Sequence, residues 1–100
     1  MSEYREHISA HQRLAILRCL EAYPAFRANA SILRESLDRL GLPATRDMVH
    51  TEIAWLAEQR LVTSEVAPGG LIVVTITERG LDAATGAAMV PGVARPSPRP

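Results

Sequence analysis

The first sixty residues alternate between apolar and polar positions with the period of an α-helix. A helix with one buried face needs an apolar stripe of roughly 100°. The arc along residues 5–22 is wider and predicts a helix that is central to the core or shares a second face with another chain. Tyr23 and Pro24 end this helix, because a residue before proline is held out of the helical conformation. The arc has two stripes, one of Leu14, Leu17 and Leu20 and one of Ile8, Ala15, Ile16 and Cys19.

Two shorter helices are predicted next, each opened by a residue that can cap it. Asn29 or Ser31 is a suitable N-cap for a second helix that stops at Gly41. Thr45 is a suitable N-cap for a third helix that ends near Arg60. The apolar residues of the third helix are spaced by four and three, so this helix is expected to pack on the first two.

After residue 60 the period changes to that of β-strands. Residues 61–67 alternate between apolar and polar, and residues 71–77 are rich in β-branched side chains. Pro68, Gly69 and Gly70 between them have turn chemistry, so the two segments predict a β-hairpin. Thr77 can cap a short closing helix through residue 84.

The chain contains 100 residues, 47% of them hydrophobic, which is enough for a single core. From residue 86 onward the composition is dominated by Gly, Ala, Pro and Arg, which cannot build a core of its own. We therefore expect one domain over residues 1–85 and a disordered tail over residues 86–100.

Three helices, a hairpin and a short closing helix follow one another in the order of the winged helix-turn-helix domain. Three segments are similar to ArsR-like and MarR-like regulators. They are residues 13–20 in the first helix, residues 53–62 from the recognition helix into the wing, and residues 76–84 after the wing. The short chain and proline-rich end also resemble the small winged-helix proteins of Mu-like phages and prophages. The resemblance covers about residues 8–85 and implies a mainly α fold with a small β-hairpin wing.

This resemblance implies double-stranded DNA as the partner and a role in phage or prophage transcription. In the family the third helix enters the major groove and the hairpin reaches the backbone or minor groove. Carried over to this chain, Arg46, His50 and Thr51 are candidates for contacts to bases or phosphates. Arg27 and Arg34, near the start of the second helix, are candidates for phosphate contacts. A homodimer formed through the first helix would suit a palindromic operator.

The distribution of charge conflicts with that expectation. Eleven arginines balance eleven acids over the whole chain, and lysine is absent. Affinity for DNA depends largely on neutralising phosphates, so a basic face is the expected footprint. Residues 45–85 instead carry three arginines and six acids, a local charge of −3. The arginines are Arg46, Arg60 and Arg79, and the acids are Asp47, Glu52, Glu58, Glu65, Glu78 and Asp82.

The alternative is a winged helix that serves as a protein-interaction module, with an accessory or assembly role in a phage and no DNA binding. The wide apolar arc, with Leu14 and Leu17, and the near-neutral surface favour this alternative. Trp55 lies at the edge of the apolar stripe of the third helix. There it either covers the base of the hairpin or anchors a protein interface.

Enzymatic, metal-binding and membrane roles are not expected. His7 and His11 share a helical face, but two ligands do not complete a zinc site, which needs three or four. A lone Cys19 in an apolar helical pattern is typical of a core residue. The chain has no phosphate-binding glycine loop, so neither catalysis nor a cofactor is expected. A charged N-terminus without a run of about 18 apolar residues predicts a cytoplasmic protein that does not contact the membrane.

Overall fold

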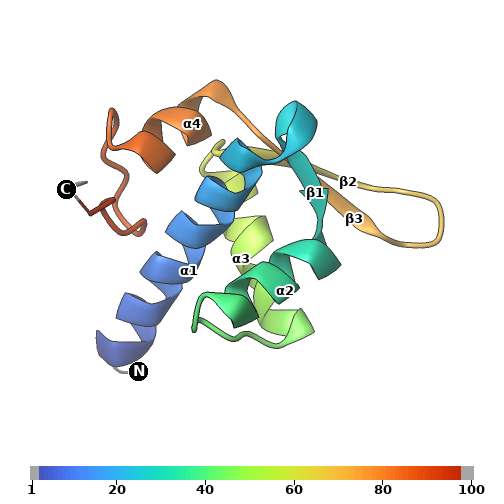
Figure 1. Ribbon diagram of the computed structural model, residues 1–100, viewed down its shortest axis with the longest axis horizontal. Helices are drawn as coiled ribbons and strands as arrows, with labels where there is room; N and C mark the ends of the chain where they lie inside the picture. Colours follow the sequence, from blue (N-terminus) through green and yellow to red (C-terminus); the bar gives the residue numbers. More distant parts are fainter. Residues whose placement is uncertain (1–2, 98–100) are drawn as a thin grey trace.

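The computed structural model of the chain describes residues 3–97 (Figure 1). Over these residues, four α-helices and a three-stranded antiparallel sheet make a small α+β fold that is compatible with a winged helix. None of these helices is long and apolar enough to cross a membrane. The elements are α1 (Glu3–Ala22), a 3₁₀ turn (Pro24–Phe26), β1 (Arg27–Asn29), α2 (Ala30–Arg39), α3 (Arg46–Glu58), β2 (Val62–Val66), β3 (Ile72–Ile76) and α4 (Glu78–Thr85).

The three later helices begin at side-chain caps, as their sequences predict. Asn29, Thr45 and Thr77 each accept a hydrogen bond from the amide three residues later, at 2.9, 3.1 and 3.0 Å. Each cap satisfies a backbone N–H that has no partner inside its helix. Helix α3 ends at Glu58, close to Arg60 as predicted, and the left-handed φ of 62° at Arg60 turns the chain toward β2.

The sheet contains one strand more than the predicted hairpin. Its order is β1-β3-β2, so β3 pairs with β2 on one side and with the three-residue β1 on the other. Ala28 of β1 lies opposite Val74, which is fully buried. A strand of three residues is too short for an alternating pattern to reveal it. In the structure β1 joins the start of α2 to the β2–β3 hairpin (Figure 1).

Helix α1 runs through the centre of the core. Its residues Ile16, Leu17 and Leu20 are 0% exposed, and α1 contacts α2, α3, α4 and the sheet. Burial on several sides within a single chain accounts for the wide apolar arc. Helix α4 packs closely on the connection between α3 and β2, since Gly80 lies directly against the backbone of Leu61.

The predicted disordered tail is corrected for residues 86–97, which pack against α1 and α3. Val90 and Val93 are 4% and 9% exposed and belong to the core. The amide of Ala94 donates a hydrogen bond to the carbonyl of Ala10 at 3.1 Å. The composition of this segment did not indicate the packing, because a segment that cannot build its own core can still bury two valines against α1 and α3. The remaining predicted tail, residues 98–100, lies outside the described residues.

Candidate nucleic-acid interface

A groove with a volume of about 190 Å³ lies where the first turns of α2 and α3 meet the far end of the hairpin. Helix α2 begins at Ala30 and α3 at Arg46, so both helix N-termini, which carry partial positive charge, open onto it. Three of the five predicted DNA-contact residues line it, namely Arg34, Arg46 and His50. The complete lining is Ala30, Ser31, Arg34, Arg46, Val49, His50, Gly70, Leu71 and Ile72.

The ionisable residues that line this groove are all basic. None of the residues that line it is acidic. Arg34 is exposed, and its Nε donates a hydrogen bond to the carbonyl of Ala44 at 3.3 Å, across the connection between α2 and α3. Arg46 is also exposed, and His50, one turn further along α3, is half-buried. Two guanidinium groups, an imidazole and two helix N-termini therefore face one hollow that suits an anion.

The other two predicted DNA-contact residues, Arg27 and Thr51, do not line the groove. Arg27 extends from β1, and its Nη2 lies 3.8 Å from Oε2 of Glu65 on β2, with both side chains at least half exposed. An exposed pair at this distance contributes little to stability. Thr51 is exposed on α3, about 100° around the helix from His50.

Four of the six acids in residues 45–85 lie away from the groove, whereas Asp47 follows Arg46 in the first turn of α3 and Glu65 lies on β2. Glu52 is only 6% exposed, and its Oε1 pairs with Nε of Arg13 on α1. Glu78 and Asp82 belong to α4, which Figure 1 places at the other end of the molecule from the first turn of α3 and the wing tip. Glu58 ends α3, at the end opposite Arg46. The interval of −3 in the sequence is thus not one acidic surface in the structure.

The predicted protein-interface residues Leu14, Leu17 and Trp55 are largely covered by their own chain, although Leu14 also lines a hollow beside α1. Leu14 is 6% and Leu17 0% exposed. The guanidinium carbon of Arg13 lies 3.9 Å from the ring centroid of Trp55, and Gly92 rests against the same ring. Trp55 thus packs beneath Arg13 and the C-terminal segment. The sequence suggested the hairpin base as its alternative cover.

Gln12 positions the groove from a distance and was not singled out in the sequence. Its side chain is 1% exposed, and its Nε2 donates to the carbonyls of Leu42 and Pro43 at 3.2 and 3.3 Å. These bonds tie the connection between α2 and α3, just before the Thr45 cap, to α1. A glutamine inside an otherwise apolar arc was the available signal.

The remaining chemically distinctive residues lie on or near α1. The rings of His7 and His11 meet edge to face, with their centroids 4.5 Å apart, and residues 3–97 contain no group of three or more metal-ligand side chains. Cys19 is a half-buried free thiol. Burial raises the pKa of Cys19, and the hydrogen bond with Ser36 and the charge of Arg39 oppose that rise. The thiol is therefore largely uncharged at neutral pH.

Two proteins are similar to this chain over most of its length. Gp26 of Escherichia phage Mu, described as uncharacterized, is 49% identical over 92 residues, which cover 92% of this chain and 94% of gp26. An uncharacterized protein of Haemophilus influenzae is 40% identical over 82 residues, or 82% of this chain and 79% of that protein. No family profile and no solved structure matches the chain. A match over 92 of 100 residues includes every residue that lines the groove.

Proposed function

The chain belongs to the family of the phage Mu protein gp26, and on that premise we propose that it is a winged-helix protein that binds double-stranded DNA as a phage or prophage regulator. The observation that carries the proposal is the acid-free groove formed by the starts of α2 and α3 and the end of the wing. The order of the elements supports the winged-helix assignment. Such a role would place the protein in the bacterial cytoplasm.

In the proposed complex, Arg34 and the N-terminus of α2 contact phosphates, which positions the protein on the duplex. The first turns of α3 enter the major groove, where Arg46 and His50 reach base edges. The hairpin tip, residues 67–70, carries no charge. The amides of Ala67 and Gly70 donate within the turn and Pro68 has no N–H, so the amide of Gly69 supplies the contact to the sugar-phosphate backbone. We infer non-covalent recognition rather than catalysis, since every group in this arrangement serves to bind an anion or a base edge.

The small number of cations predicts a modest dependence on salt. With two phosphate contacts, from Arg27 and Arg34, the logarithm of the affinity falls with a slope of about −1.8 against the logarithm of salt concentration. The affinity then drops about 12-fold between 50 and 200 mM salt, a weaker dependence than for a protein with a broad basic face.

Fluorescence anisotropy with duplex fragments of the source genome, at 50 and 200 mM salt, tests the proposal. Arg46→Ala should weaken binding to a preferred fragment about tenfold or more, because it removes both a phosphate or base contact and a charge. Arg34→Ala should weaken all fragments alike. Arg60→Ala is the matched control, since Arg60 is an exposed arginine beyond the opposite end of α3. Failure of the folded protein to bind any fragment at 50 mM salt would overturn the proposal.

A further inference from the structure

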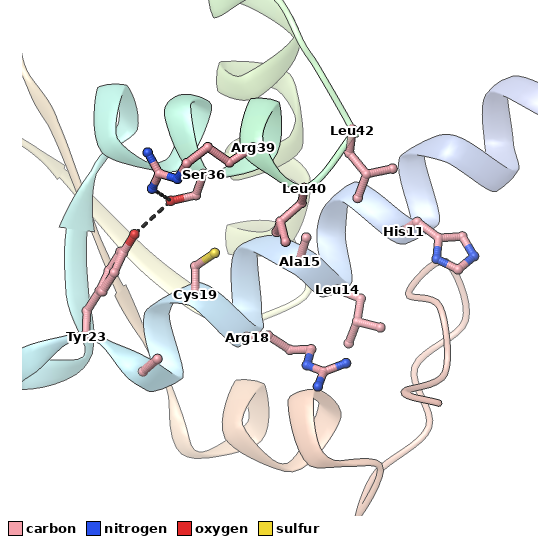
Figure 2. A pocket seen from close by; sticks show the side chains of 11 residues that line it. His11, Leu14, Ala15, Arg18, Cys19, Tyr23, Ser36, Arg39, Leu40 and Leu42 are labelled. Atoms are coloured by element: carbon pink, nitrogen blue, oxygen red, sulfur yellow. Dashed lines mark hydrogen bonds between the residues drawn. The ribbon is translucent and has the colours of Figure 1, made fainter. Parts of the chain in front are cut away.

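A second and larger hollow, which we call the α1 trough, runs along the outer side of α1 (Figure 2). Its volume is about 620 Å³, and it is open to solvent. The α1 trough lies at the end of α2, where Ser36, Arg39 and Leu40 line it, whereas the groove lies at the start of α2. The two hollows share no lining residue, so ligands could occupy both at once.

An apolar strip runs along the floor of the α1 trough, and its length suits an elongated ligand. Ala15, Cys19 and Ala22 follow one another along α1 at spacings of four and three, so small side chains form one continuous strip. Leu40 stands on the rim and is 57% exposed, although it is a large apolar residue. From His11 to Ala22 the lined part of α1 is about 17 Å long, which matches about three turns of a second helix.

The charges of the α1 trough are all of one sign. Arg18 and Arg39 line it together with His11, and no carboxylate does. Arg18 is half-buried, yet it makes no hydrogen bond or ion pair with any residue in the described range 3–97. Arg39 has only a long contact of 3.4 Å from its Nη2 to Oγ of Ser36 (Figure 2). Two guanidinium groups next to apolar surface are thus left without an anionic partner.

We propose that the α1 trough binds an acidic amphipathic helix of a partner protein. The apolar face of that helix packs on the small-residue strip and on Leu40, as in other helix-in-groove complexes. Its carboxylates pair with Arg18 and Arg39, whose fork-shaped donors suit bidentate contact with a carboxylate. Burial keeps the thiol of Cys19 uncharged, so the floor itself presents no negative charge against the ligand.

Charge also argues against a second copy of this chain as the occupant. A two-fold interface centred on the α1 trough would bring Arg18 and Arg39 toward their own copies, and no lining carboxylate is present to neutralise them. The open shape of the α1 trough disfavours a small molecule as its occupant. Pockets for small molecules enclose most of the ligand, whereas the α1 trough is open to solvent and Leu40 on its rim is exposed.

The test begins with a displayed library of random 16-residue peptides, from which binders to the full-length chain are selected. Peptides that also bind the variant Arg18→Glu/Arg39→Glu are removed by counter-selection. The proposal expects the enriched peptides to be acidic, with apolar residues spaced by three and four. The best peptide should bind Arg18→Glu or Arg39→Glu at least tenfold more weakly than the unaltered chain, because attraction becomes repulsion. Arg60→Glu, which makes the same charge change at an exposed site outside the trough, should leave the affinity unchanged.

A charge-swapped peptide, with lysine in place of each acid, should bind the double variant and not the unaltered chain. NMR shifts of the ¹⁵N-labelled chain on peptide binding should centre on residues 11–23 and 36–42. Circular dichroism checks folding, and Arg18→Gln serves the same comparison if the glutamate variants fail to fold. DNA binding should be unchanged in Arg18→Glu, so this test and that of the groove can fail independently.

Several results would overturn the proposal. One is enrichment of neutral or basic peptides, and another is equal binding to the double variant. A third is a concentration-dependent dimer in sedimentation that Arg18→Glu abolishes, since the occupant would then be a second copy. A fourth is displacement of the peptide by a simple carboxylate such as decanoate at micromolar concentration, which would assign the α1 trough to a small ligand.

Discussion

The pair formed by Arg13 and Glu52 makes the sharpest stability prediction. Nε of Arg13 contacts Oε1 of Glu52, and the two side chains are 18% and 8% exposed. Arg13 also donates from Nη1 to the carbonyl of Gly92 at 3.0 Å and lies over Trp55. One guanidinium thus joins α1, α3 and the C-terminal segment. Glu52→Gln removes the negative charge while preserving the shape of the side chain.

The magnitude follows from burial. Removing one partner of a fully buried ion pair costs roughly 3–5 kcal/mol. Water reaches part of Arg13, and a glutamine oxygen can still accept its hydrogen bond, so we expect Glu52→Gln to lower the free energy of unfolding by about 2 kcal/mol. In a chain of this size that loss corresponds to a fall in Tm of about 8–16 °C.

Arg13→Gln should cost more than Glu52→Gln, because it also removes the hydrogen bond to Gly92 and the cation–π contact with Trp55, and leaves a buried carboxylate without a partner. The double variant should recover part of that loss. The two substitutions should therefore be non-additive, with a coupling free energy of about 1–3 kcal/mol. The amide of Ala94 should lose protection from hydrogen exchange in Arg13→Gln, since the C-terminal segment is then less firmly held.

Urea unfolding of the four proteins, followed by circular dichroism, measures these differences. The fluorescence of Trp55, the single tryptophan, reports separately on the site itself. Glu58→Gln is the matched control, because Glu58 is an exposed acid on the same helix. If Glu52→Gln lies within about 0.5 kcal/mol of the unaltered chain, or if the two substitutions add, the structural role assigned to this pair is refuted.

Three further predictions concern local features. Gly80→Ala should lower the free energy of unfolding in urea by about 1–3 kcal/mol, because the new methyl group would overlap the carbonyl of Leu61. Helix propensity alone predicts a gain of about 1 kcal/mol, so a higher free energy of unfolding would contradict the packing argument. Thr45→Ala should cost about 1 kcal/mol in the same assay through loss of the α3 cap, and no loss would show that this bond is not formed. Cys19 should react with iodoacetamide at pH 8 more slowly than free cysteine does, because burial raises the pKa of its thiol. In urea Cys19 should react as fast as free cysteine. The same rate in the native protein would contradict the burial of Cys19.

The starts of the helices and the position of the hairpin followed from the sequence because their causes are local. Asn29, Thr45 and Thr77 cap helices through amides only three residues away. The change of period after residue 60 likewise depends on neighbouring positions. The strand β1 had no such signal, since three residues are held in the sheet by β3, more than forty positions further along the chain.

The sequence by itself therefore determined the four helices, the hairpin and their order, and it supplied the side chains on which the proposed DNA contacts depend. Tertiary structure alone decided which of those residues meet, because Arg34, Arg46 and His50 face one groove only when α2, α3 and the wing have packed. It also decided that residues 86–97 are held, through contacts with Arg13 and Ala10 some eighty positions earlier. Charge shows the same difference. A sum over residues 45–85 is negative, but electrostatic interaction depends on distance in space, and packing pairs Glu52 with Arg13 and leaves no carboxylate among the residues that line the groove.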